Sequence, residues 1–223
     1  MIHIDRGYSI FDQVFDKGEM ASALDALKKT EVGRTRAGAR HVLHVPAVRG
    51  LATDARLLRI ASQFVGPTPV PFRATLFDKS PSSNWLVVWH QDTALPLSCR
   101  IEHPEWGPWS IKAGVHYAHA PAWALEQIVA LRVSLDDSTI TNGPLRVLMD
   151  THRCGVLSDE RIEQLAKSIA PVDCVAASGG VVAMRPLTIH ASSKSSDDRP
   201  RRVLHIEYSA TVKLGQGAEL AVC

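Results

Sequence analysis

The sequence predicts an α+β fold in which helices cover one sheet of a two-sheet barrel. Three observations support this class. Helical patterns fill the first third of the chain, short segments rich in Val, Ile and Leu follow residue 70, and clusters of Gly, Pro, Asp and Ser separate those segments. Short apolar segments bounded by turn residues are typical of β-sandwiches and barrels.

Three segments carry helix signals. Residues 18–30 place apolar side chains at helical spacing and end with two lysines, and residues 53–66 have a broad apolar face followed by Gly66. Residues 158–171 begin with Ser158, a good N-cap, and end at Pro171. These features are start and stop signals of amphipathic helices.

Six segments are expected to form strands, and their compositions favour β structure. They are residues 70–78, 84–92, 128–136, 143–150, 174–184 and 201–212. The segment 98–124, which holds three tryptophans, shows no clear pattern. The predicted order is therefore helices first, then many strands with one helix between them.

Length and composition narrow the class of protein. The chain has 223 residues, 45% hydrophobic and 22% charged, which suits a single globular domain over residues 1–223. A formal net charge of +2 is too small to attract nucleic acid or an anionic membrane strongly. No apolar run is long enough to span a bilayer, and residues 1–13 lack a signal-peptide pattern. Four scattered cysteines without a CxxC pair favour free thiols in a cytoplasmic protein, whose oligomeric state stays open.

A candidate metal site begins where an apolar run ends in His90-x-Asp92. Residues two apart on a strand point to the same side, so both side chains can reach one ion. His190, which we expect to end a second strand-like run, is the best third ligand. Two imidazoles and one carboxylate on one face of an octahedral ion resemble the non-haem iron(II) oxygenase centres. Taken alone, the pair is equally compatible with a hydrogen-bonded structural role.

The last predicted strand has two different faces. Arg201, His205 and Glu207 share one face, whereas Leu204 and Tyr208 share the other. The apolar face suits packing against helices, and the charged face suits a polar barrel interior. An inward Arg201 could bind a carboxylate through two parallel hydrogen bonds. A solvent-exposed loop cluster of arginines explains this segment equally well.

Several blocks together resemble the phytanoyl-CoA dioxygenase family of Fe(II)/2-oxoglutarate oxygenases. They are "FVGPTPVPFRATLFDKSP", "WHQD", "NGPLRVLMDTHRCG" and "HASSKSSDDRPRRVLHIEY", and they cover about residues 60–210. The resemblance implies a double-stranded β-helix (jelly roll, cupin-like) core with the N-terminal helices packed on one sheet. It also implies Fe(II) held by His90, Asp92 and His190, with Arg201 binding the far carboxylate of 2-oxoglutarate.

The same resemblance implies further cosubstrate contacts. Ser192 matches a family position beside 2-oxoglutarate, and Thr75 and Arg132 match two more pocket positions, although both differ in residue type from the best-known members. His116 and His119 lie in a polar aromatic segment beside the expected barrel mouth, where they are candidate substrate contacts; local packing explains them equally well. No catalytic residue is expected beyond the metal ligands.

The resemblance implies an oxygenase that uses Fe(II), 2-oxoglutarate and O2 to hydroxylate a small organic molecule, with release of succinate and CO2. The sequence shows no basic patch that would hold a CoA phosphate, which favours a small molecule over an acyl-CoA. Two alternatives remain. One is a cupin-type metal-dependent hydrolase or isomerase, which needs no cosubstrate arginine, and the other is a ligand-binding jelly roll without oxygenase activity.

Overall fold

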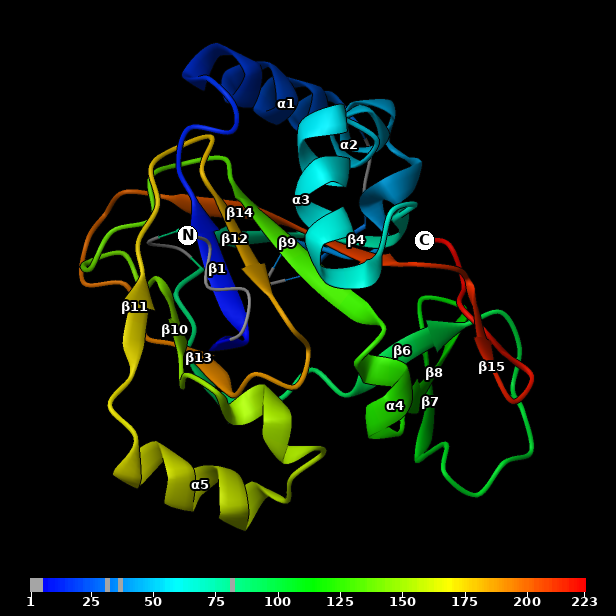
Figure 1. Cartoon of the computed structure of the whole chain (residues 1–223). Helices are drawn as coiled ribbons and strands as arrows, with labels where there is room; N and C mark the ends of the chain where they lie inside the picture. The colour runs from blue at the N-terminus through cyan, green and yellow to red at the C-terminus, as the bar shows by residue number, and fades with distance from the viewer. Residues whose placement is uncertain (1–5, 31–32, 36–37, 81–82) are drawn as a thin grey trace.

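The computed structural model describes residues 6–30, 33–35, 38–80 and 83–223, and it combines antiparallel sheets with a few helices (Figure 1). Residues 1–5, part of the stretch tested for a signal peptide, lie outside the described residues. Within the described ranges, every helix is too short or too polar to cross a bilayer. The predicted mixture of helices and strands is confirmed.

A seven-stranded antiparallel sheet forms the centre of the molecule. Its strand order is β1-β12-β9-β14-β4-β3-β2, so strands distant in sequence lie side by side. The longest pairing joins β14 to β4. Its strands are β1 (Tyr8–Phe11), β2 (Arg34–Thr35), β3 (Gly38–Ala39), β4 (Val70–Lys79), β9 (Ile128–Ser134), β12 (Val181–Met184) and β14 (Arg201–Ser209).

The remaining strands form two smaller sheets and a hairpin. A four-stranded sheet has the order β11-β10-β13-β5, and a three-stranded sheet has the order β6-β8-β7. The strands are β5 (Val87–His90), β6 (Ala94–Leu97), β7 (Trp109–Lys112), β8 (Val115–His119), β10 (Leu145–Val147), β11 (Val172–Cys174), β13 (His190–Ser192), β15 (Lys213–Gly215) and β16 (Ala218–Glu219).

One prediction about strands needs correction, and one unassigned segment turns out to contain strands. The segment 174–184 contains the end of β11 and all of β12, which belong to different sheets. The chain turns between them at Gly179, whose φ of +86° suits glycine, and a Cβ there would lie 2.0 Å from the carbonyl oxygen of Phe15. The unassigned segment 98–124 supplies β7 and β8.

The three predicted helices are present. Asp16 starts α1 (Lys17–Lys29) with a capping box, and Gly66 ends α3 (Ala55–Val65) with a positive φ of 101°. Ser158 caps α5 (Asp159–Ser168). Two further helices are α2 (Pro46–Ala52) and α4 (Ala122–Leu125), and short 3-10 helices span Val42–His44 and Thr151–Cys154.

One apolar cluster contains side chains from the N-terminal helices and from the large sheet. Leu57 and Ile60 of α3 belong to it together with Leu131 of β9 and Leu204 of β14. The Tyr208 hydroxyl adds a hydrogen bond of 3.0 Å to the Ala52 carbonyl at the end of α2. In Figure 1, α1, α2 and α3 lie on one side of the β9–β14 region, away from the four-stranded sheet.

The opposite face of the large sheet is polar and faces the interior. Alternate residues of β14 align with alternate residues of β4 and β9, so their side chains form rows across three strands. The rows are Lys79–Arg201, Phe77–Val203–Ser134, Thr75–His205–Arg132 and Arg73–Glu207–Ala130.

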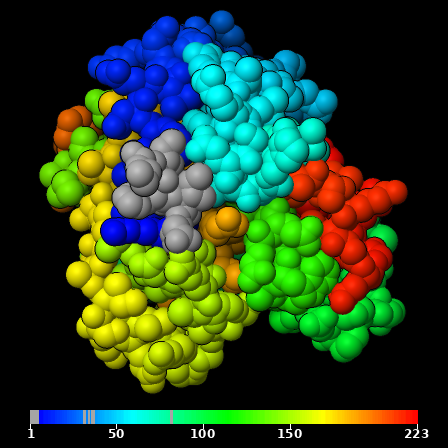
Figure 2. Space-filling view, in the orientation of Figure 1, coloured from blue at the N-terminus to red at the C-terminus, as the bar shows by residue number. Residues whose placement is uncertain are grey.

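The two larger sheets pack against each other through a second apolar cluster. Leu145 and Val147 of β10 meet Val182 and Met184 of β12 there. The C-terminal segment pairs with β6, the edge strand of the three-stranded sheet: Ala221 donates a backbone hydrogen bond to the Pro96 carbonyl. Figure 2 shows this segment in red beside the green surface of residues near 100–125.

Candidate metal and cosubstrate site

His90, Asp92 and His190 converge where β5 and β13 lie side by side. His90 is the last residue of β5 and pairs in register with His190. The Asp92 carboxylate lies 3.6 Å from His90 Nε2 and 3.5 Å from His190 Nε2. One ligand atom from each residue lies within 4.8 Å of the other two. His190 begins β13 rather than ending a strand, because residues 185–189 form the turn that brings the chain back from β12.

Backbone carbonyls orient both imidazoles. His90 Nδ1 lies 2.8 Å from the Val88 carbonyl oxygen, and His190 Nδ1 lies 2.9 Å from that of Thr188. A carbonyl oxygen only accepts hydrogen bonds, so each Nδ1 carries a proton, and in the neutral ring the lone pair is on Nε2. Both lone pairs are therefore on the nitrogens that face Asp92, as a metal site requires.

The residue between the two ligands holds the loop in place. Buried Gln91 donates to the carbonyls of Leu187 and Gly155 at 2.8 and 2.9 Å, and its Oε1 accepts from the Leu157 amide at 2.9 Å. The Asp92 amide donates to the Pro186 carbonyl at 3.0 Å. The loop after β5 is thus fastened to the turn before β13.

The electrostatics favour a cation at this point. Burial alone would raise the pKa of Asp92, but His190, His90 and His205 lower it well below its usual value. Burial lowers the pKa of His190 to about 4, against the opposing effect of Asp92. The set at neutral pH is therefore a carboxylate beside a neutral His190 imidazole. This donor set fits an Fe(II) ion with open coordination positions.

A second polar cluster lies at one end of β14 and β4. Arg201 and Lys79 are register partners and are only 3% and 1% exposed. Lys79 Nζ donates to Ser192 Oγ at 2.9 Å and to the Ser193 carbonyl at 2.6 Å. Arg201 donates to Ser192 Oγ at 3.4 Å and to the Asn142 carbonyl at 3.3 Å. Within the described chain, no ion pair joins either cation to a carboxylate.

Thr75 and Arg132 lie on either side of His205 in one row across the large sheet. Arg132 Nη1 is 3.0 Å from His205 Nδ1, and its guanidinium lies 5.3 Å from the centre of the Phe77 ring. The charge of Arg132 acts on the pKa of His90, and the charge of Asp92 acts on the pKa of Arg132. Along β4, this row lies between the Lys79–Arg201 pair and Arg73.

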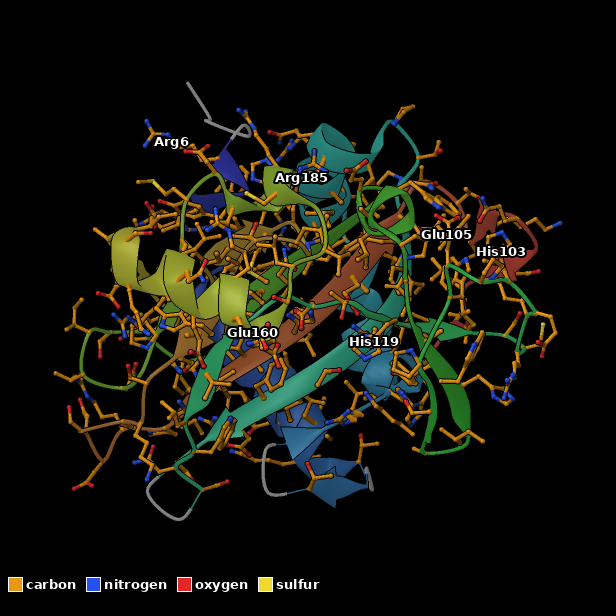
Figure 3. The ribbon with its side chains drawn as sticks, turned by 90° about the horizontal axis from the view of Figure 1, so that it is seen from below. Arg6, His103, Glu105, His119, Glu160 and Arg185 are labelled. Atoms are coloured by element: carbon orange, nitrogen blue, oxygen red, sulfur yellow. The ribbon has the colours of Figure 1, made fainter. Side chains whose placement is uncertain are left out.

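A cavity of about 310 Å³ opens beside Asp92, and Thr75, Tyr117 and His119 are among its lining residues. His119 Nδ1 lies 2.8 Å from Thr93 Oγ1. Figure 3 shows His119 near the middle of its view, whereas His103 and Glu105 lie toward one edge. His116 is absent from the lining residues, because alternate residues of β8 point to opposite sides.

Sequence reasoning did not single out Lys79 or Gln91. Lys79 extends the alternation of Thr75 and Phe77 by one step, and this alternation is the signal that could have found it. Gln91 offers no comparable signal, since its three partners come from two distant loops.

Comparison with known proteins identifies a matching family and several solved structures with a similar fold. Residues 5–203 match the family model described as Phytanoyl-CoA dioxygenase (PhyH). EctD from S. alaskensis, solved with 2-oxoglutarate and 5-hydroxyectoine, is 20% identical with a TM-score of 0.72, over 99% of this chain and 83% of that one. HygX from Streptomyces hygroscopicus, solved with nickel and 2-oxoglutarate, is 18% identical with a TM-score of 0.67, over 94% and 85%.

A third similar structure has a different named activity. The non-heme alpha ketoglutarate dependent epimerase SnoN from nogalamycin biosynthesis is 19% identical with a TM-score of 0.67, over 94% of this chain and 80% of that one. Comparison with curated proteins gave no match. At these identities the solved structures show a shared fold.

Proposed function

Because this chain belongs to the phytanoyl-CoA dioxygenase family, we propose that it is an Fe(II)- and 2-oxoglutarate-dependent oxygenase. We propose that it hydroxylates a small organic molecule and releases succinate and CO2. The observation that carries the proposal is the convergence of His90, Asp92 and His190. In the same interior lie the buried cations Arg201 and Lys79, which pair with no carboxylate of the described residues. EctD and HygX, whose structures hold 2-oxoglutarate, support it.

Three side chains hold the iron in this proposal. His90 and His190 bind through Nε2, since their Nδ1 atoms donate to backbone carbonyls, and Asp92 supplies the charged oxygen. When bound, the iron supplies open coordination positions at which 2-oxoglutarate and O2 react. Gln91 keeps Asp92 in place by fastening its loop to the segment before His190.

Arg201 and Lys79 bind the far carboxylate of 2-oxoglutarate, and Ser192 Oγ, which both cations already contact, lies beside it. An anion would bind strongly to two buried cations that contact neutral oxygens, because burial strengthens charge-assisted hydrogen bonds. Thr75 and Arg132 line the same interior from β4 and β9.

We also propose the finer features of the fold. The seven- and four-stranded sheets would form a double-stranded β-helix, with the N-terminal helices on the outer face of the larger sheet, and residues 1–223 would form one domain. The shared apolar clusters and the similarity to solved structures support this arrangement. Free thiols at Cys99, Cys154, Cys174 and Cys223 support a cytoplasmic location.

The test is binding of Fe(II) and 2-oxoglutarate without O2, followed by succinate formation in air. We expect His190→Ala and Asp92→Ala to abolish succinate formation while the circular dichroism spectrum stays unchanged. Arg201→Gln should weaken 2-oxoglutarate binding at least about tenfold, because a charge-assisted bidentate contact is lost. Wild-type turnover in His190→Ala would show that the metal assignment is wrong.

The product separates the oxygenase from its alternatives. Hydroxylation adds the mass of one oxygen atom to the substrate, whereas epimerisation leaves the mass unchanged. A hydrolase or isomerase would need the three metal ligands but would be indifferent to Arg201→Gln. A ligand-binding jelly roll would release no succinate with any substrate.

A further inference from the structure

The cavity beside Asp92 carries an excess of positive charge. Arg40, Arg73 and Lys112 are among its lining residues, and Asp92 is the one carboxylate among the described residues that line it. Arg73 is already paired with buried Glu207. Within the described chain, no ion pair joins Arg40 or Lys112 to a carboxylate. Among the described residues, the cavity lining therefore includes two cations without a carboxylate partner, the exposed Arg40 and the partly buried Lys112.

Two of these cations lie near one aromatic ring. Lys112 Nζ lies 4.8 Å from the centre of the Tyr117 ring, and the Arg73 guanidinium lies 5.5 Å from it. The Tyr117 hydroxyl lies 2.7 Å from His41 Nε2. Burial lowers the pKa of Lys112, and Arg40 and Arg73 lower it further. Burial, Arg73 and Arg40 also lower the pKa of His41, so the surroundings disfavour more positive charge.

This cationic group is separate from the cations assigned to 2-oxoglutarate. Arg73 and Lys79 are six residues apart on β4, which corresponds to about 20 Å along a strand. The lining residues of the cavity include neither Arg201, Ser192 nor Lys79. The row that contains Thr75 lies between Arg73 and Lys79. One dianion of the size of 2-oxoglutarate at Lys79 and Arg201 leaves Arg40 and Lys112 without a carboxylate partner among the described residues.

We propose that the substrate is a small organic anion whose carboxylate or phosphate group binds between Arg40 and Lys112. The inference rests on the proposed oxygenase function and adds the substrate class. The cavity volume of about 310 Å³ is at the lower end of the ligand-pocket range, roughly 300–1,000 Å³, which suits a small molecule. Thr93 and His119 offer hydrogen bonds to neutral polar groups of the substrate. Because the proposed metal ligand Asp92 lines the same cavity, a molecule bound there lies next to the metal site.

The anion site can be tested without iron. We would titrate the metal-free full-length protein with inorganic phosphate and follow backbone amide resonances by NMR. We expect shifts at Lys112 and Tyr117, and a dissociation constant at least about tenfold higher in the Arg40→Gln/Lys112→Gln double variant. The control Lys213→Gln removes an exposed lysine outside the cavity and should bind as wild type. Equal phosphate binding in the double variant and wild type would overturn the inference.

The substrate class is tested with the iron-loaded protein. Matched pairs of small carboxylic acids and their amides are compared for stimulation of succinate formation above the rate without substrate. The inference expects acids to stimulate more than amides, and a neutral or cationic molecule as the best substrate would contradict it. If no 2-oxoglutarate turnover occurs at all, the proposed function fails, and the phosphate titration still decides whether the cavity binds anions.

Discussion

Lys79 and Arg201 bring two positive charges into the protein interior, where their described hydrogen-bond partners are neutral oxygens. Burial, together with the nearby charges of Arg201 and Arg132, lowers the pKa of Lys79 to about 8. Burial also lowers the pKa of Arg201 to about 9, with Arg132 adding to the effect. An anion between Lys79 and Arg201 would relieve this repulsion, so the cost of burying them is recovered on ligand binding.

The first prediction concerns pH. Lys79 loses its charge as the pH rises through about 8, so 2-oxoglutarate affinity should weaken above that pH. Calorimetry of the Fe(II)-loaded protein without O2 measures this affinity. Lys79→Gln should bind about tenfold more weakly at pH 7 and lose the dependence near pH 8, whereas Lys79→Arg should keep tight binding to higher pH. Wild-type affinity in Lys79→Gln would contradict the role of this lysine.

The second prediction concerns Gln91, whose side chain makes three hydrogen bonds from a buried position. Gln91→Ala leaves two carbonyls and one amide without their partner, so the free energy of unfolding should fall by about 2–4 kcal/mol. Iron affinity should fall with it, because the Asp92 loop is released. Urea unfolding and Fe(II) titration measure the two effects. Exposed Gln63, whose amide contacts only its own helix, is the control: Gln63→Ala should change neither.

At the scale of elements, α2 and β14 are joined by a single buried hydrogen bond. The Tyr208 hydroxyl donates to the Ala52 carbonyl, and burial raises the pKa of this tyrosine. The ring packs in the same apolar cluster as Leu57 of α3 and Leu204 of β14. The helices and the large sheet thus share both apolar contacts and one polar contact.

The third prediction separates these two contributions. Tyr208→Phe keeps the ring and leaves the Ala52 carbonyl without its partner, so it should destabilise the protein by about 1 kcal/mol. Leu57→Ala removes buried carbon atoms and should cost about 2–5 kcal/mol. Chemical unfolding measures both. A Tyr208→Phe effect as large as that of Leu57→Ala would mean that the hydroxyl does more than satisfy one carbonyl.

At the scale of the whole molecule, a buried ion pair within the large sheet is also hydrogen-bonded to the three-stranded sheet. Glu207 of β14 pairs with Arg73 of β4, and Arg73 also donates to the Ala94 carbonyl of β6 at 3.3 Å. Burial alone would raise the pKa of Glu207, but Arg73 and His205 lower it below its usual value. Loss of this charge would leave Arg73 buried without a counter-ion.

The fourth prediction follows from that pKa. Glu207 stabilises the fold at pH values above its unfolded pKa of about 4.3, and the contribution is lost as the pH falls toward its lower folded pKa. Glu207→Gln should therefore cost about 3–5 kcal/mol at pH 7 and progressively less below pH 4. Thermal unfolding of the metal-free protein across pH measures this. As a control, Asp25→Asn removes an exposed pair with Lys28 and should cost no more than about 1 kcal/mol.

Local patterns in the sequence predicted much of the fold and part of the site. Ser158 and Gly66 mark helix ends because capping depends on neighbouring residues alone. His90 and Asp92 were found together because strand alternation is also local. The strand boundary at His190 was wrong, because the turn before it depends on contacts with the distant loop around Gln91.

The sequence by itself determined the two-faced β14 strand, the helices, and the residue types available to bind a metal, since these follow from the order of polar and apolar residues. Only the tertiary structure decided which charged side chains lie close to one another. Lys79 reaches Arg201 through the β4–β14 register, and Arg40 and Lys112 share a cavity although 72 residues separate them. Strand register and chain crossing bring such residues together, and neither is encoded in local spacing.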